Sequence, residues 1–270
     1  LHPNAQKKLY RQMDEICGQK VISTHSPYIA ACAELETIRS FYKTDTLKVG
    51  SFQNLDLTQE GVRKIKRQVI NSRGDIFFSK LIVFFEGETE EQALPILFEK
   101  YLGRTPVELG VDFVGVGGFE GYSPFLKFAN QFNIPCVILS DADSQEIVEK
   151  VKQQHRSVYG LEPKDSKIFF LDLGNDYEKQ LIVDGYQEEI KEAILSLKVY
   201  MNAKHKAAKE QSDIEETEAL GNDDLYKKMT TSKTQMAPAV AEKIAASGKG
   251  IPRAVVEVFE FVRTTLKMEK

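Results

Sequence analysis

A run of five apolar residues, 81–85, is followed directly by Glu86 and Gly87. Apolar residues without polar alternation are typical of a strand that is buried on both faces, as in a parallel sheet covered by helices. Glu86 then falls at the carboxyl end of the strand, which is the edge where open α/β sheets bind ligands. Gly87 allows a sharp turn into a helix that we expect to begin near Thr89 as N-cap, with Glu90 in its first turn. Two carboxylates would then face one crevice, an arrangement suited to cations.

A second apolar strand, predicted over 135–140, also ends in acid, because Asp141, Ala142 and Asp143 follow it. Side chains alternate along an extended chain, so the two aspartates share one face and the alanine points away. Together with the two glutamates above, they would form a cluster of four acids. Such a cluster repels itself unless cations or protons are present, and ligation by oxygen alone selects Mg²⁺ or Mn²⁺ over zinc.

This pattern, Glu86-Gly-x-Thr-Glu90 after one strand and Ser140-Asp-x-Asp143 after a later one, resembles the TOPRIM domain of topoisomerases, primases and several nucleases. The residues of this motif are most similar to those of the OLD family of ATPase-coupled nucleases, including the nuclease subunit of the Gabija antiphage system. The resemblance implies a DNA endonuclease that nicks or cuts DNA with two Mg²⁺ or Mn²⁺ ions, in phage defence or DNA processing. It implies Glu86, Glu90, Asp141 and Asp143 as metal ligands, with Asp141 bridging both ions, and it implies a helicase-like partner.

The resemblance assigns two further residues. A predicted strand over 167–173 leads to Asp176 and Glu178. OLD nucleases place a glutamate of the metal site here, and Glu178 matches it, with Asp176 as the other candidate for this position. Alternatively, both acids have a structural role, in which Asp176 caps a helix and Glu178 lies in its first turn. Lys249, with a glycine on each side, resembles the lysine that OLD nucleases place beside the metals, where it would stabilise developing charge. A solvated loop lysine is the alternative interpretation.

Strands and helices alternate through the middle of the chain, which predicts an α/β fold with a TOPRIM-like, mainly parallel sheet flanked by helices. We expect Pro95 to bend or shorten its helix. The expected elements are a helix over 89–102, a strand over 111–116, a glycine turn at 117–118, a helix over 122–131 and a helix over 144–155. The expected divisions are the TOPRIM core at 76–182, a helical subdomain at 183–246 with a polar loop or helix end over 204–224, and a return to the core at 247–270 whose final helix covers 251–267.

The first part of the chain, 1–75, resembles the C-terminal part of an ABC-type ATPase and a linker. A helix is predicted over 4–17, a strand ending at 24–26, two short strands over 37–42 and 47–52, and a basic helix over 58–72 whose charges are expected to be solvated. In this family His25 would sense the terminal phosphate of ATP; a polar residue at a strand edge is the alternative. No Gly-x-x-x-x-Gly-Lys-Ser/Thr loop occurs in these residues, so we expect ATP to act only in a full-length protein. We also expect the missing part of the ATPase domain to mediate formation of a homo-oligomer.

Composition constrains the partners. A net charge of −4 and a pI near 5.8 do not favour nucleic-acid binding by bulk charge, although residues 225–270 form a basic tail. No apolar run approaches the ~20 residues that span a bilayer, so we expect a cytoplasmic protein without membrane contact. Three cysteines without CxxC spacing indicate reduced structural thiols. Two other functions stay open: a catalytically silent TOPRIM used as a scaffold or assembly module of an ABC-type ATPase, and a primase-like or topoisomerase-like enzyme.

Overall fold

The computed structural model describes residues 2–72, 74–161, 163 and 165–268. Its centre is a four-stranded sheet in the order β4-β3-β5-β6, with every neighbouring pair parallel. This confirms the expected α/β fold with a parallel sheet flanked by helices. The strands are β3 (Leu81–Phe85), β4 (Val111–Gly115), β5 (Cys136–Ser140) and β6 (Ser166–Phe170). Residues 1, 73, 162, 164, 269 and 270, which include the end of the basic tail, lie outside the described residues.

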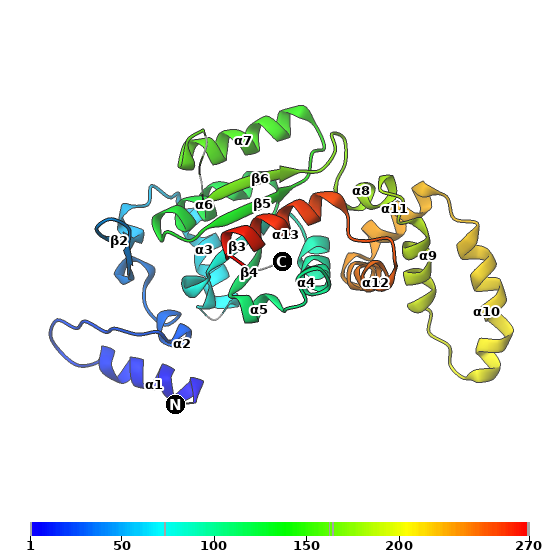
Figure 1. Ribbon diagram of the computed structural model, residues 1–270. Coiled ribbons are helices and arrows are strands. Elements are labelled where there is room, and N and C mark those ends of the chain that lie inside the picture. The colour runs from blue at the N-terminus through cyan, green and yellow to red at the C-terminus, as the bar shows by residue number, and fades with distance from the viewer. Residues whose placement is uncertain (1, 73, 162, 164, 269–270) are drawn as a thin grey trace.

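Helices cover both faces of the sheet, which explains why β3 has no polar residue. Leu81, Val83 and Phe85 face one core, which contains side chains of α4 (Glu88–Leu102) and α13 (Arg253–Thr265). Ile82 and Phe84 face a second core with α3 (Gln59–Asn71), α6 (Tyr122–Gln131) and α7 (Gln145–Tyr159). In Figure 1 the sheet accordingly lies between α7 and α13. Each residue of β3 is fully buried as a result.

Beyond the sheet the chain is helical, and this part lies beside the carboxyl ends of the strands (Figure 1). The helices are α8 (Tyr177–Val183), α9 (Gln187–Ser196), α10 (Ala203–Glu218), α11 (Asn222–Thr231) and α12 (Lys233–Ala246). Of the two expectations for 204–224, a polar loop or a helix end, the helix is present: α10 covers the stretch up to Glu218. Asn202 accepts a hydrogen bond from the His205 backbone as an N-cap, and ion pairs such as Lys206–Glu210 at i,i+4 support α10 although its residues are polar.

The N-terminal part contains short elements. They are α1 (Pro3–Asp14), α2 (Pro27–Ala30), η1 (Leu35–Thr37), the antiparallel pair β1 (Arg39–Lys43) and β2 (Leu47–Ser51), η2 (Phe52–Asn54) and η3 (Asp75–Phe78). The two short strands and α3 are confirmed, whereas the strand predicted to end at 24–26 is a loop. Val21 is 92% exposed there and His25 is also exposed, because among the described residues no strand lies alongside to bury the apolar pair at 21–22.

Short elements also connect the core, namely α5 (Pro106–Leu109) and η4 (Phe119–Gly121). One expectation for α4 was wrong, and half of another was. Its N-cap is Gly87, and Thr89 is a buried residue of the first turn. Pro95 does not shorten the helix, which continues to Leu102, whereas a bend at Pro95 stays a prediction. Within the described part of the chain, no helix is both long and apolar enough to cross a membrane.

Candidate metal-binding site at the carboxyl edge of the sheet

Glu86 directly follows β3 and is held from two sides. Its side-chain Oε1 accepts a hydrogen bond from Ser140 Oγ at 2.8 Å, and its carbonyl accepts from the backbone N–H groups of Gly117 and Gly118, both at 3.2 Å. Both glycines have positive φ, as the predicted glycine turn after β4 requires. Burial raises the pKa of Glu86, and the bond from Ser140 partly offsets this. The first predicted ligand therefore sits at the sheet edge in a fixed position.

Asp141 and Asp143 follow β5 on a loop that the next loop holds in place. Between them the buried Ala142 donates its N–H to the Asn175 carbonyl at 3.0 Å and accepts from the Gly174 N–H at 2.7 Å. Asp143 is exposed, whereas burial and the nearby carboxylates of the cluster, Glu90 first among them, raise the pKa of Asp141 to about 9. The alternation expected from the sequence thus holds for Ala142, and the repulsion expected of clustered acids acts on Asp141.

Glu90 lies in the first turn of α4 and is only 4% exposed. Burial, together with repulsion from Glu178 and Glu86, raises its pKa to about 7. Gly87 leaves room for this side chain, because a Cβ at that position would lie 3.3 Å from Glu90 Oε2. The glycine before the helix is therefore explained by the space it leaves for a carboxylate.

Asp176 and Glu178 both lie near the cluster, but Asp176 caps a helix whereas Glu178 forms a buried ion pair. Asp176 is the N-cap of α8: its Oδ1 accepts from the Lys179 N–H at 2.8 Å, and its Oδ2 accepts from Tyr226 Oη at 2.6 Å. Glu178 is 2% exposed, and its Oε1 accepts from Thr89 Oγ1 at 2.7 Å and pairs with Lys233 Nζ at 2.9 Å. The capping arrangement foreseen as the alternative is therefore present, and Glu178 nevertheless lies near enough to Glu90 to help raise its pKa.

Gln180 organises the loop that carries these acids. Its side-chain oxygen accepts from the Asp172 N–H and from Asn175 Nδ2, and its side-chain nitrogen donates to Asp172 and Asp184, all at 2.9 to 3.0 Å. The same loop is bonded to Ala142, as described above. The spacing between the aspartates after β5 and the acids of α8 thus depends on one buried amide.

Lys249 is not brought to this cluster. Its ammonium donates to the Gly185 carbonyl, lies 4.0 Å from Glu189 Oε2 and sits over the Tyr186 ring. These partners follow the end of α8, whereas Glu178 lies in its first turn. Lys249 also follows the end of α12, a helix of 14 residues that extends about 20 Å from Lys233. In this structure the lysine that contacts the acids is therefore Lys233.

Sequence reasoning missed Lys233 and Tyr226. The available signal was weak: a lysine opens a helix whose first turn contains no acid, although the helix macrodipole favours acids there. Its partner Glu178 lies far away in the sequence, so no short motif joins them. Tyr226 gave no local signal.

The donor chemistry of the cluster fits a hard divalent cation. Glu86, Glu90, Asp141 and Glu178 offer only oxygen; burial first and then repulsion among these carboxylates raise the pKa values of Glu90 and Asp141, and a cation would relieve that repulsion. The cluster is nevertheless open: in the described residues, no three histidine, cysteine, aspartate or glutamate side chains stand close enough together to hold an ion as they are. Binding would require these carboxylates to move together.

Comparisons with known proteins concern the domain and the fold. Residues 77–143 match the family model described as Overcoming lysogenization defect protein-like, TOPRIM domain. The C-terminal region of the Burkholderia pseudomallei OLD protein is similar in structure, with a TM-score of 0.52, 22% sequence identity, and coverage of 70% of this chain and 99% of that chain. The C-terminal region of the Xanthomonas campestris pv. campestris OLD protein gives a TM-score of 0.52 and 21% identity, over 72% of this chain and 97% of that chain. No curated protein sequence matches the chain.

The matched segment runs from η3 through β3, β4 and β5 to Asp143, so it contains four of the predicted ligands. The resemblance to a TOPRIM domain of the OLD type is confirmed, whereas the similarity to the Gabija subunit stays a prediction. Residues 77–143 of this chain therefore match an OLD-like TOPRIM domain, within a fold like that of the C-terminal region of OLD proteins.

Proposed function

We propose that this chain is a metal-dependent DNA endonuclease module that hydrolyses phosphodiester bonds. The observation that carries the proposal is the convergence of acids at one edge of an OLD-like TOPRIM sheet, where they raise one another's pKa values. Glu86, Glu90, Asp141 and Asp143 would hold Mg²⁺ or Mn²⁺, with Glu178 joining them. Two such ions, when bound, activate a water and stabilise the leaving oxygen of a phosphodiester.

The chain's own residues contribute positioning and charge. Ser140 orients Glu86, and the bonds of Ala142 to the following loop fix the direction of Asp141. Because the raised pKa of about 9 keeps Asp141 protonated at neutral pH without a cation, metal binding there must release a proton. Proton release on addition of Mn²⁺, measured in a weakly buffered solution, is thus a direct sign of occupation of this cluster.

Lys249 remains a proposed catalytic residue on the strength of the family resemblance alone. To stabilise charge at a scissile phosphate, it would have to leave the Gly185 carbonyl and approach the acids. We also propose that residues 1–75 belong to an ABC-type ATPase, with His25 as its switch residue, and that this part mediates oligomer formation and contact with a helicase-like partner. Isolated as this chain, the protein should cleave without regard to ATP and hydrolyse none.

Nicking of a supercoiled plasmid tests the activity. With Mg²⁺ or Mn²⁺ the chain should convert supercoiled to open-circular or linear DNA, and EDTA should stop it. Asp141→Ala should abolish cleavage, as should Glu86→Ala, because the two metal ions would act together and the loss of one ligand would disrupt their binding. Cleavage by purified Asp141→Ala at the wild-type rate would show that the site is wrong.

A silent TOPRIM scaffold is the second candidate function. The observation that favours it is the open cluster, since no ready-made cation cage exists in the described residues. Under this alternative the chain neither binds Mn²⁺ at this edge nor nicks DNA. Proton release without nicking would instead indicate a metal site that has lost its catalytic role.

A further inference from the structure

Lys233 occupies a position that is unfavourable for a cation. It is the first residue of α12, where the unpaired N–H groups of the helix already create positive potential. The N-cap, Ser232, makes no side-chain hydrogen bond to that end. A lysine is stable there because acids face it: Glu178 lies 2.9 Å away, and the charges of Glu90 and Asp176 also act on it.

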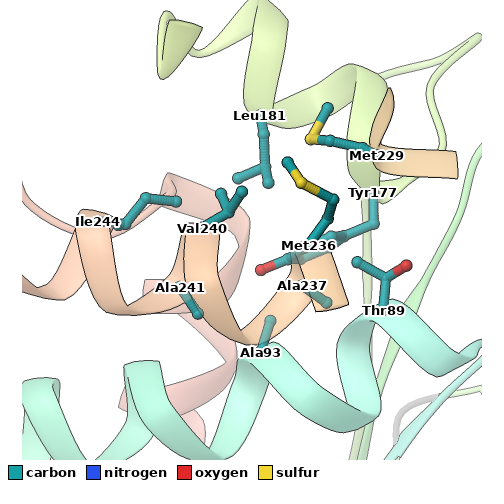
Figure 2. Close-up of a pocket in the computed structure, with 10 residues that line it drawn as sticks. All are labelled: Thr89, Ala93, Tyr177, Leu181, Met229, Met236, Ala237, Val240, Ala241 and Ile244. Atoms are coloured by element: carbon teal, nitrogen blue, oxygen red, sulfur yellow. The ribbon is translucent and has the colours of Figure 1, made fainter. Parts of the chain in front are cut away.

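The contact with Glu178 joins three helices at one oxygen. Glu178 Oε1, on α8, accepts from Thr89 Oγ1 of α4 and pairs with Lys233 Nζ of α12. Thr89 also lines a small apolar cavity between α4, α8 and α12, together with Tyr177 and Met236 (Figure 2). Glu178 itself is only 2% exposed, and the exclusion of water strengthens its ion pair.

Lys233 itself is less enclosed than its partner. Its side chain is 38% exposed, whereas that of Glu178 is 3% exposed. A flexible four-carbon stem allows the ammonium to move into solvent while the carboxylate stays in place. The pair is thus asymmetric: one partner is fixed, and the other can leave.

We propose that Lys233 is a resident counter-ion of the acidic cluster and that it competes with a divalent cation for Glu178. This inference rests on the proposed metal site. Two cations cannot share one carboxylate oxygen at close range without strong repulsion, so a metal ion that binds Glu178 must displace the ammonium. Lys233 therefore keeps the cluster partly neutralised without metal and weakens its metal affinity.

Mn²⁺ binding, followed by the loss of the free-ion EPR signal, tests the competition. Lys233→Gln removes the competing charge and should tighten Mn²⁺ binding by about tenfold, which is the size of effect expected from removing one neighbouring positive charge. Lys233→Arg keeps the charge and should bind within about twofold of wild type. Lys243→Gln is the matched control, because Lys243 lies near the other end of α12 and pairs with Glu192.

Stability provides a second measurement that does not depend on activity. In EDTA, Lys233→Gln should melt at a lower temperature than wild type, because the buried Glu178 loses its ion pair. Saturating Mn²⁺ should remove that difference. In a Glu178→Gln background, Lys233→Gln should change Mn²⁺ affinity by less than it does in wild type.

The outcomes separate the two proposals. Equal or weaker Mn²⁺ binding by Lys233→Gln, in protein that melts cooperatively, would overturn the competition while leaving the metal site intact if wild type binds Mn²⁺. If neither wild type nor Lys233→Gln binds Mn²⁺, the metal site and the competition both fail. Binding by Lys233→Gln alone would support the competition in its strongest form.

Discussion

Asp141→Asn should stabilise the protein when no divalent cation is present. The ordinary pKa of this carboxyl is 3.8, and in the folded protein burial and the neighbouring acids raise it to about 9. Below the lower value both the folded and unfolded states are protonated, so the residue has no effect on stability. Between the two values the unfolded chain loses the proton and the folded protein keeps it, so the free energy of unfolding falls as pH rises. Above the higher value the loss is complete.

The size of the effect follows from the interval below neutral pH. One pKa unit corresponds to about 1.4 kcal/mol, and pH 7 lies roughly three units above the ordinary value, so Asp141 destabilises the folded state by at most about 4 kcal/mol. Glu90 shares the same repulsion, so the two residues do not contribute independently. We therefore expect Asp141→Asn to gain about 2–4 kcal/mol at pH 7, equivalent to roughly 5–15 °C in melting temperature.

The assay is thermal and urea unfolding in EDTA from pH 5 to pH 9. Wild type should lose stability across this range, and Asp141→Asn should have a shallower slope. Asp143→Asn is the matched control, since it makes the same substitution two residues away at an exposed position, where about 1 kcal/mol or less is expected. Mn²⁺ should stabilise wild type more than Asp141→Asn.

Two results would refute this reasoning. If Asp141→Asn is less stable than wild type at pH 7 in EDTA, the Asp141 carboxyl does not destabilise the folded protein. If the pH slope is the same in both proteins, other groups cause it, and the acids do not interact as closely as the structure indicates.

Three further predictions concern residues around the cluster. Ser140→Ala should lower the free energy of unfolding by about 1 kcal/mol in urea, because Glu86 loses a hydrogen bond; an unchanged midpoint would contradict this. Gln180→Leu should cost about 2–4 kcal/mol and weaken Mn²⁺ binding, because four hydrogen bonds that order the loop are lost; wild-type affinity in a folded variant would show that the loop orders itself. Lys249→Ala should slow single-turnover cleavage by about 10²–10³-fold if the lysine acts at the phosphate, with DNA affinity almost unchanged; an unchanged rate, with a lower salt dependence of binding, would make it a phosphate contact only.

The parts of the fold that sequence reasoning predicted are those with a repeated local signal. β3 and β5 each combine a continuous apolar run with an acid at the end, and these two features together determine both burial and the position of the acid. Because parallel strands end at the same edge, Glu86 and Asp141 could be brought together without knowledge of the rest of the chain. The order of the strands was not needed for this conclusion.

The parts that failed depend on neighbours far away in the sequence. The apolar pair before His25 suggested a strand, but a strand requires an adjacent strand, and the segment is a loop. Thr89 has the intrinsic preference of an N-cap, yet its hydroxyl is used by Glu178 from another helix. Lys233 reaches the same carboxylate from α12, a contact that only the packed helices create.

The position of α13 affects how the protein can be synthesised. This helix contacts β5, β6 and α4 and contributes Val255, Val258 and Phe259 to the core on one face of the sheet. The sheet strands leave the ribosome long before residues 253–265 do, so for that interval the apolar residues of this face lack the part of their cover that α13 provides. The nascent chain is therefore exposed to proteases and to aggregation late in translation, and a premature stop before α13 should yield a chaperone substrate in place of a shortened but folded protein.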